Sequence, residues 1–367
     1  MKRIAIVGAG NIGSTIARML ADTGDYAVTL ADSRPAPATR EPRIRRVMTD
    51  ATDPAALAAL MQGQFAVLSA APYHLTAGIA AAAKAAGVHY LDLTEDVAST
   101  RAVKALAQGA QTAFIPQCGL APGFISIVAA DFARRFDVLH DLRLRVGALP
   151  TYPSNALNYN LTWSTDGVIN EYCEPCEAIV DGQLRATSAL EECETFSLDG
   201  VAYEAFNTSG GLGTLCETLA GKVRNLNYRT IRYPGHAAIM KMLLNDLRLR
   251  DRRGVLKDIL EHALPATMQD VVIVFVTVSG LKSGRLVQET YANKIYAQEQ
   301  AGQMLSAIQI TTAAGACAVL DLLVQGRLPQ AGLVRQEEIA LADFLAGRFG
   351  RVYAQAPAAA LELEAVA

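Results

Sequence analysis

Residues 3–32, RIAIVGAGNIGSTIARMLADTGDYAVTLAD, decide the fold of the first part of this chain. They contain, in order, a short apolar run, three glycines with the spacing G-x-G-x-x-G (Gly8, Gly10 and Gly13), a helical apolar pattern, and a second apolar run that ends at Asp32. This order predicts a buried strand, a glycine turn that opens a helix, and a second strand closed by an acid. Glycines in that setting are typical of a turn that binds a dinucleotide.

Each glycine has its own role in such a turn. We expect Gly8 to allow the tight turn, Gly10 to let the backbone approach a pyrophosphate, and Gly13 to let the helix pack closely on the strand. The N-terminus of the helix would stabilise the phosphate charge. Asn11 and Ile12, which lie inside the turn, are therefore predicted cofactor contacts.

Asp32 indicates which dinucleotide is bound. Its carboxylate can accept hydrogen bonds from both ribose hydroxyls and would repel a 2′-phosphate, so the sequence favours NAD over NADP. Arg34 is the counter-argument, because it would bind a 2′-phosphate if Asp32 turned away. Asp50 follows the third predicted strand, where it would either contact the adenosine half of the cofactor or be an ordinary loop acid.

The alternation of strands and helices continues beyond the second strand. The further predicted strands are residues 47–49, 65–70, 88–93 and 112–116. Helices of about 10–15 residues are expected between them. Such alternation predicts an α/β protein with an open, doubly wound parallel sheet, the Rossmann fold.

The pattern changes beyond the sixth strand. Residues 141–149 alternate apolar and polar side chains and residues 271–278 form an apolar run, which together predict a largely antiparallel or mixed sheet. The region from about 122 to 307 is therefore interpreted as a second, α+β domain. Residues 305–323 and 336–347 are predicted helices that follow it.

Composition excludes several classes of protein. Of 367 residues, 51% are hydrophobic and 19% charged, and 33 basic against 36 acidic residues give a net charge of −3, so no basic field for nucleic acid is present. The apolar run of residues 271–278 is too short to cross a bilayer, which needs about 20 helical residues. The opening MKRIAIVGAG lacks a signal-peptide cleavage pattern. We expect a cytoplasmic protein without a membrane or nucleic-acid partner.

One cysteine pattern suggests a metal or redox site. Cys173 and Cys176 form a C-x-x-C pair that Cys193 and Cys216 would have to complete as a zinc site. A second C-x-x-C pair is missing, and no strand–helix–strand unit precedes the first as a thioredoxin-like site requires. The sequence therefore favours reduced cysteines beside a turn and predicts no metal.

Seven motifs are spread over most of the chain. They are GAGNIG (8–13), SAAPYH (69–74), HYLDLTED (89–96), CGLAPGF (118–124), TWSTDGVINEYCEPCEAIVDG (162–182), SGGLGTLCETLAGKVRNLNYRTIRYPGH (209–236) and GRLPQAGLVRQEEI (326–339). Together they resemble the saccharopine dehydrogenase/reductase superfamily, and within it the lysine 6-dehydrogenase branch. The glycine turn is shared by many enzymes, whereas APGF and YRTIRYPGH are much narrower signals.

The resemblance implies a domain organisation and an activity. Residues 1–121 plus 308–367 would form the Rossmann domain, and residues 122–307 an inserted domain for substrate binding and for dimerisation as a homodimer. Lysine 6-dehydrogenases oxidise the side-chain amine of L-lysine with NAD, and the product aldehyde cyclises with its own α-amine. The implied partner is therefore a small amino-acid substrate.

The resemblance also implies a substrate cleft between the carboxyl edge of the parallel sheet and the inserted domain, as in other open α/β folds. The loops that leave the strands supply its predicted residues. Predicted cofactor contacts are Ala70, Ala71 and Pro72, and predicted substrate contacts are Tyr73, Thr94, Cys118, Gly119, Glu171 and Tyr172.

A base is required, because an alkylammonium must lose a proton before its carbon can be oxidised. His236 is the first candidate, since imidazole titrates near neutral pH and the preceding RYPG places it at a turn. The alternative interpretation is a residue at a helix N-terminus that makes a backbone hydrogen bond. His74, in the SAAPYH motif, is the next histidine candidate, and Glu95 and Glu171 are alternative bases. Of these two acids, Glu95 is predicted to be catalytic together with His236.

Arg232 is predicted to bind the substrate α-carboxylate, because a planar guanidinium binds a carboxylate through two hydrogen bonds. Arg224 and Arg229 compete for this role. Residues 210–214, GGLGT, would either present backbone amides to an anion or be a flexible loop. Trp163 is interpreted as part of the core or of a cavity wall.

Three functions compete at this point. The first is an NAD-dependent dehydrogenase of a primary amine, most closely a lysine 6-dehydrogenase. The second is a reductase or dehydrogenase of a secondary amine of the saccharopine or carboxyspermidine type, which needs a larger cleft and a second carboxylate-binding residue. The third is a sensor that binds NAD without chemistry. The intact motifs at residues 118–124 and 228–236 argue against a sensor, because a protein that only binds NAD need not position a substrate for hydride transfer.

Overall fold

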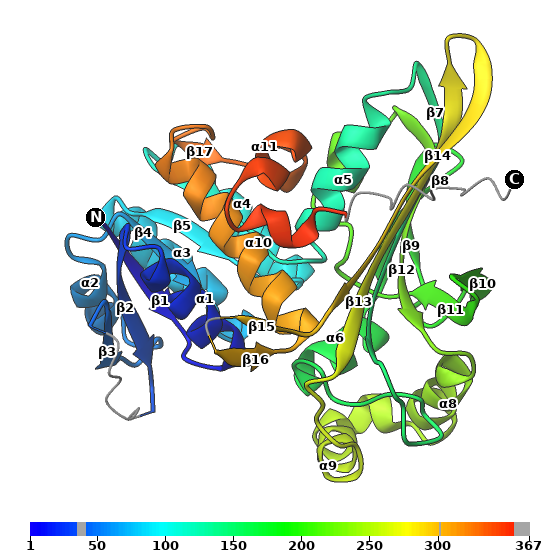
Figure 1. The fold of residues 1–367 in the computed structure, drawn as a ribbon, viewed down its shortest axis with the longest axis horizontal. Coiled ribbons are helices and arrows are strands. Elements are labelled where there is room, and N and C mark those ends of the chain that lie inside the picture. The colour runs from blue at the N-terminus through cyan, green and yellow to red at the C-terminus, as the bar shows by residue number, and fades with distance from the viewer. Residues whose placement is uncertain (35–41, 301, 356–367) are drawn as a thin grey trace, which may run out of the picture.

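The computed structural model describes residues 1–34, 42–300 and 302–355. Two β-sheets, each with its own helices, stand side by side, and the C-terminal helices lie against the first (Figure 1). The first sheet is parallel and the second is mixed, so the predicted fold class is confirmed.

The first sheet has the topology of a dinucleotide-binding fold. From edge to edge its strands are β17 (Gly332–Leu333), β6 (Ala113–Ile115), β5 (His89–Asp92), β4 (Ala66–Ser69), β1 (Lys2–Val7), β2 (Tyr26–Asp32) and β3 (Ile44–Met48). All neighbours are parallel. The chain order reverses beside β1, so the crevice at the carboxyl ends of β1 and β4 is where this fold binds ligands.

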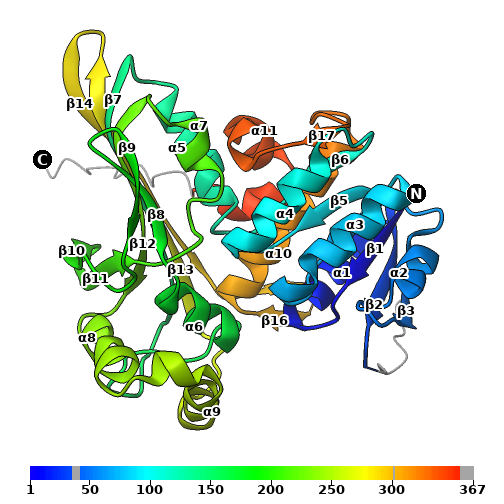
Figure 2. The same ribbon diagram turned by 180° about the vertical axis from the view of Figure 1, so that it is seen from behind.

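Helices cover both faces of this sheet. One face packs on α2 (Pro54–Met61), α3 (Thr76–Ala86) and α4 (Val97–Ala107), which lie nearest the viewer in Figure 2. The other packs on α1 (Asn11–Asp22) and α10 (Ala307–Val324). Asp53 caps α2, with its carboxylate accepting from Ala55 N at 2.9 Å and Pro54 in the first helical position.

The second sheet is built around the long strand β7 (Val138–Pro150). In order it contains β10 (Glu194–Leu198), β11 (Val201–Asn207), β12 (Val223–Arg232), β7, β13 (Asp270–Lys282) and β14 (Arg285–Tyr296), with β8 (Cys176–Val180) and β9 (Gln183–Thr187) attached to β12. Only β7 and β12 run parallel within this lobe.

Helical segments and a small hairpin complete the second lobe and its connections. They are α5 (Phe124–Ala133), α6 (Thr165–Cys173), α7 (Leu215–Thr218), α8 (His236–Lys241), η2 (Met242–Asp246), η3 (Leu249–Arg252), α9 (Arg253–Ala263), and the hairpin of β15 (Gln298–Gln300) and β16 (Gln303–Leu305). In the first lobe, η1 (Tyr73–Leu75) joins β4 to α3.

Two elements that carry the site were not predicted. Strand β12 has buried side chains at alternate positions, but polar and charged residues among them hide the apolar pattern. Helix α6 begins at a capping signal, because the Ser164 hydroxyl accepts from Gly167 N at 3.2 Å. That serine is the signal that would have indicated the helix.

The C-terminal segment returns to the first lobe. Strand β17 extends the parallel sheet, and α10 packs along α1. The single helix predicted over residues 336–347 is wrong: η4 (Gln336–Glu338) and α11 (Leu341–Ala346) are separated by extended residues, and η5 (Gly350–Tyr353) follows. Ile339 is fully buried in that extended stretch, so packing of this side chain overrides the helical pattern.

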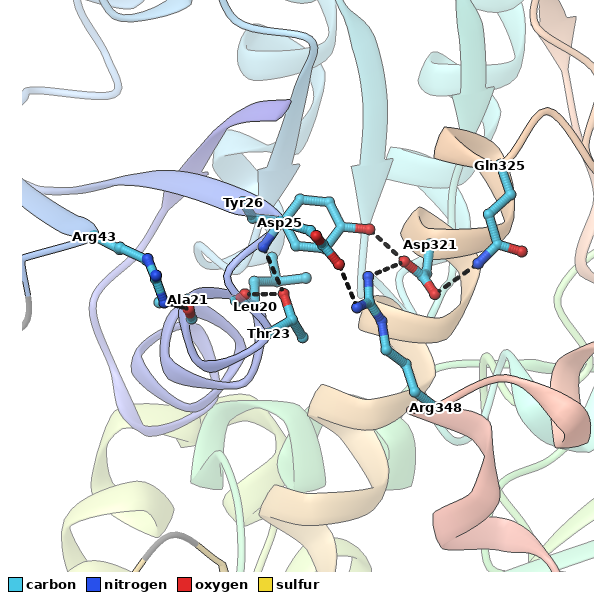
Figure 3. A network of polar contacts seen from close by, with 9 residues as sticks. All are labelled: Leu20, Ala21, Thr23, Asp25, Tyr26, Arg43, Asp321, Gln325 and Arg348. Carbon is cyan, nitrogen blue, oxygen red and sulfur yellow. Dashed lines mark hydrogen bonds and ion pairs between the residues drawn. The ribbon is translucent and has the colours of Figure 1, made fainter. Parts of the chain in front are cut away.

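Arg348 links the C-terminal segment to the start of β2 in the first sheet. Its guanidinium pairs with Asp25 at 2.5 Å and with Asp321 of α10 at 2.7 Å, and Asp321 also accepts from the hydroxyl of buried Tyr26 (Figure 3). Gln325 bonds the other oxygen of Asp321 at 2.9 Å. The C-terminal helices are therefore held to the sheet by charge as well as by apolar contact.

Within the described residues, α10 is the one helix long and apolar enough to span a membrane, yet 83% of it is buried inside the protein. Its N-terminus is joined to the second lobe. The Asp270 carboxylate, at the start of β13, accepts from the backbone N–H of Ala307 at 2.5 Å and of Ile308 at 3.0 Å. The helix is thus a core element that connects the two lobes.

Candidate active site

The glycine turn between β1 and α1 has the shape that a dinucleotide requires. Gly8 has a φ of +104°, which side chains rarely adopt, and a Cβ at Gly13 would lie 1.9 Å from the Gly8 carbonyl oxygen. A Cβ at Gly10, by contrast, would meet no atom within 4 Å. The turn is closed toward the protein and open beside the N-terminus of α1, so these residues fit a bound pyrophosphate.

Asp32 lies at the end of β2, under this turn. One carboxylate oxygen accepts from Ala9 N at 2.8 Å and the other from Arg34 N at 2.9 Å. Partial burial acts to raise the pKa of Asp32, but these N–H donors and the Arg34 charge hold it below its usual value. Asp32 is therefore an ionised acceptor, with the exposed Arg34 side chain paired to it at 3.4 Å.

Asp50 has only local partners. Its exposed carboxylate accepts from the backbone N–H and the hydroxyl of Thr52 at 2.8 and 2.7 Å. These contacts are those of an ordinary turn acid, one of the two interpretations that the sequence left open.

A cavity of about 840 Å³ lies between the two lobes. It brings together residues far apart in the sequence, from the glycine turn to the second sheet. The predicted residues that line it are Asn11, Ile12, Ala70, Ala71, Pro72, Tyr73, His74, Thr94, Glu95, Gly119, Glu171 and Arg232. Those that do not line it are Gly8, Gly10, Gly13, Asp32, Asp50, Cys118, Tyr172 and His236.

Arg232, at the end of β12, faces the cavity although only 2% of the residue is exposed. Its Nε donates to the Tyr172 hydroxyl at 3.0 Å and its Nη1 to the Ile231 carbonyl at 2.9 Å. Nη2 has no protein acceptor among the described residues. The far end of the guanidinium is therefore free to bind a carboxylate.

The two competing arginines are occupied elsewhere. Arg224 is exposed and pairs with Asp181 at 3.3 Å. Arg229 pairs with Glu192 and with Glu194, each at 2.9 Å. Neither lines the cavity.

Two carboxylates, Glu95 and Glu171, also face the cavity. Within the described part of the chain, neither carboxylate accepts a hydrogen bond from another residue. Burial raises the pKa of Glu95 to about 7, and the charges of Asp96 and Asp92 add to this effect. Burial and then the charge of Glu95 raise the pKa of Glu171 to about 8, although Arg232 acts in the opposite direction. Because Glu171 has the higher pKa, it ionises after Glu95 and carries the effect of the repulsion between the two carboxylates.

His236 is not at the cavity wall, in contrast to its predicted role as the base. It is the first residue of α8, its Nδ1 lies 2.9 Å from the Leu157 carbonyl oxygen, and its Nε2 lies 3.1 Å from the Tyr172 hydroxyl. Burial, followed by the charge of Arg232, lowers the pKa of His236 to about 3. A ring enclosed behind Tyr172 cannot reach a substrate proton, so the alternative interpretation, a helix-terminal residue with a backbone bond, describes it.

Two predicted substrate contacts are also enclosed. Tyr172 has no exposed surface, and its hydroxyl lies between Arg232 and His236. Cys118 is 1% exposed, and its thiol bonds the Ile115 carbonyl at 3.0 Å. Tyr172 and Cys118 therefore pack against residues of the cavity wall but do not line the cavity themselves.

Residues that sequence reasoning missed line the same cavity. Tyr228 and Thr230 lie on the same side of β12 as Arg232, because alternate strand residues share a face. Arg253 of α9 also lines it and pairs with Glu174 at 2.6 Å. The alternation along β12 is the signal that would have found the first two.

The GGLGT loop supports the site by packing. A Cβ at Gly210 would lie 2.4 Å from the Glu95 carbonyl oxygen, and one at Gly211 would lie 2.3 Å from the Tyr228 ring. The loop therefore holds the backbone of Glu95 and the ring of Tyr228 in place. Trp163 is part of the cavity wall, as interpreted from the sequence.

The six cysteines are free thiols. Burial raises the pKa of Cys173 and raises that of Cys176 to about 12, so neither is an activated thiolate. Over residues 1–34, 42–300 and 302–355, no group of three or more His, Cys, Asp or Glu residues could hold a metal ion.

A dinucleotide-binding sheet joined to a second lobe across a charged cavity defines an oxidoreductase that uses a nicotinamide cofactor. Comparison with known families agrees. Residues 4–115 match the saccharopine dehydrogenase NADP binding domain, and residues 119–350 match the saccharopine dehydrogenase C-terminal domain. The chain belongs to the saccharopine dehydrogenase family, which confirms the superfamily predicted from the motifs.

One of the solved structures that match this chain shares its fold. The chain is similar to the apo saccharopine dehydrogenase (L-Glu forming) of Saccharomyces cerevisiae, with 16% identity, a TM-score of 0.78, and coverage of 94% of this chain and 97% of that one. It is also matched by the DAP dehydrogenase of C. glutamicum in complex with DAP, at 14% identity, a TM-score of 0.49, and coverage of 94% and 95%.

Proposed function

We propose that the chain is an NAD-dependent amino-acid dehydrogenase that oxidises the side-chain amine of L-lysine to the semialdehyde, a lysine 6-dehydrogenase. The proposal depends on one observation. A single cavity beside the glycine turn presents an arginine, Arg232, and two carboxylates, Glu95 and Glu171, whose ligand-facing atoms have no partner among the described residues. One fixed cation and two acids complement a substrate with one carboxylate and two amines.

The charges suggest a division of roles. The Arg232 guanidinium binds the α-carboxylate through two hydrogen bonds. Glu171 holds a substrate ammonium, and Glu95 takes a proton from the amine to be oxidised, since a base is most effective with a pKa near the working pH. The glycine turn and Asp32 would hold the dinucleotide, which would supply the hydride acceptor for the carbon of this amine. Water then adds to the resulting iminium carbon, and ammonia leaves with formation of the aldehyde.

Asp32 supports NAD as the cofactor, because an ionised carboxylate beneath the glycine turn accepts from ribose hydroxyls and repels a 2′-phosphate. The description of the matched family domain names NADP instead. Arg34, exposed and two residues away, is the group that would favour NADP.

A second candidate function is supported by Arg253. A dehydrogenase or imine reductase of the saccharopine or carboxyspermidine type would need another cation for a second carboxylate, and Arg253 lines the cavity. Its ion pair with Glu174 reduces the charge available to a ligand. We therefore place this function second.

Absorbance at 340 nm tests both functions. The enzyme is incubated with NAD or NADP and with L-lysine, saccharopine or L-glutamate. We expect cofactor reduction with L-lysine and NAD. Reduction with saccharopine alone would support the second candidate, and no reduction with any of the three would contradict an amino-acid dehydrogenase. We also propose a homodimer, which light scattering tests by a mass of twice 39.0 kDa.

A further inference from the structure

Behind Arg232 lies a chain of buried polar contacts that the proposed chemistry does not use. It runs from the Leu157 carbonyl through the His236 ring and the Tyr172 hydroxyl to Arg232 Nε, with successive distances of 2.9, 3.1 and 3.0 Å. Arg232, Tyr172 and His236 are at most 2% exposed. These contacts connect α6 with β12 and α8, and Tyr172 lies 60 residues from Arg232 and 64 from His236 in the sequence.

The chemistry of the groups determines the direction of every hydrogen bond. A carbonyl oxygen can only accept, so Nδ1 of His236 carries the ring proton and donates to Leu157. Nε2 of the neutral ring is then an acceptor, and the Tyr172 hydroxyl must donate to it. The hydroxyl oxygen in turn keeps its lone pairs for Arg232 Nε–H, which can only donate.

Aromatic rings enclose the same groups. The Arg232 guanidinium lies 4.9 Å from the centroid of the Tyr159 ring, and the Phe206 ring stacks on His236 with centroids 6.1 Å apart. Together with the Ile231 carbonyl on Nη1, these contacts hold two of the three guanidinium nitrogens of a residue that lines the cavity.

We propose that His236 and Tyr172 are positioning residues that orient Arg232 for the substrate carboxylate. His236 fixes the direction of the Tyr172 hydroxyl, and the hydroxyl fixes Arg232 Nε. This inference rests on the proposed function in assigning the carboxylate to Arg232. It replaces the catalytic role that the sequence suggested for His236.

Tyr172→Phe removes the hydroxyl and keeps the ring. We expect the KM for L-lysine to rise about tenfold, because a hydrogen bond to a charged group is lost. The KM for NAD and kcat should change little. Tyr159→Phe is the matched control: it lies over the same guanidinium, but its hydroxyl has no hydrogen-bond partner among the described residues. That variant should keep the wild-type KM.

A pair of His236 variants tests the direction of the hydrogen bonds between Leu157, His236 and Tyr172. Asn resembles the Nδ1 side of the ring and retains the donor to Leu157, but it offers no acceptor to Tyr172. Gln resembles the Nε2 side and restores that acceptor through its amide oxygen. His236→Asn should raise the KM for L-lysine about as much as Tyr172→Phe does, and His236→Gln should restore most of the affinity.

Two readouts separate positioning from general damage. The first is the ratio of kcat/KM for L-lysine to that for 1,5-diaminopentane, which lacks the carboxylate. This ratio should fall about tenfold in Tyr172→Phe, whereas a loss of folded protein lowers both values equally. An unchanged ratio, or an equal fall in Tyr159→Phe, would overturn the proposal.

The second readout does not depend on activity. Crystal structures of wild type and Tyr172→Phe should show the Arg232 guanidinium in a different orientation in the variant. An unmoved guanidinium would overturn the positioning role even if the wild type oxidises L-lysine. Conversely, a guanidinium that turns in an enzyme inactive on L-lysine would contradict the proposed substrate and keep the positioning role.

Discussion

The two raised carboxylates lead to a specific expectation for the pH dependence of the enzyme. If Glu95 is the base, it works only when ionised, and burial raises its pKa from 4.5 to about 7. The acidic limb of kcat/KM for L-lysine should therefore lie near pH 7 rather than near 4.5. At pH 6 about one tenth of Glu95 is ionised, so kcat/KM should be about one tenth of its plateau.

Glu171→Gln is the informative perturbation, because it keeps the size of the side chain and removes the carboxylate that ionises after Glu95. Since Glu171 is still largely protonated where Glu95 ionises, the acidic limb should stay near pH 7 in this variant. The KM for L-lysine should rise at the same time, because one ammonium partner is lost. Glu95→Gln should instead lower kcat by about 10²–10⁴ at every pH.

The assay is initial-rate NAD reduction from pH 5 to 9 in buffers of constant ionic strength. A wild-type limb near pH 4.5, or a limb that moves to lower pH in Glu171→Gln, would refute this order of ionisation. Loss of kcat in Glu171→Gln together with retention in Glu95→Gln would show that the roles are exchanged. A limb that disappears in His236→Asn would restore the histidine as the base.

Three further outcomes are expected. Asp32→Ser should narrow or reverse the preference for NAD in kcat/KM, since Arg34 is then free to pair with a 2′-phosphate; a wild-type preference for NADP would contradict this. Arg232→Ala should raise the KM for L-lysine about ten- to hundredfold, because hydrogen bonds to a charged group contribute roughly 1.5–3 kcal/mol. The KM for NAD should not change. A fall in kcat at constant KM would instead show that the arginine acts on the transition state. Gly13→Ala should weaken NAD binding in calorimetry and lower the melting temperature, because its Cβ would lie 1.9 Å from the Gly8 oxygen; unchanged values would contradict the close helix–strand contact.

The charges in the cavity could be predicted only in part. Arg232 and Glu95 were correctly singled out as residues that face it, but the sequence could not separate Arg232 from Arg224 and Arg229. All three arginines belong to one strand, β12, and only the tertiary structure shows that Arg224 and Arg229 are paired with acidic side chains. His236 was misjudged because its environment consists of residues from three distant elements.

The sequence by itself determined the nucleotide-binding half of this protein. A strand, a glycine turn, a helix and a closing acid follow one another within residues 3–32, and each depends on local sterics and periodicity, so the pattern can be read without knowledge of the rest of the chain. Only the tertiary structure decided the substrate half. Glu95, Glu171 and Arg232 come from a loop, a helix and a strand of two lobes, and their burial, shifted pKa values and free hydrogen-bond donors arise from the enclosure that these elements form together. No local pattern encodes that enclosure, because it depends on packing between segments more than sixty residues apart.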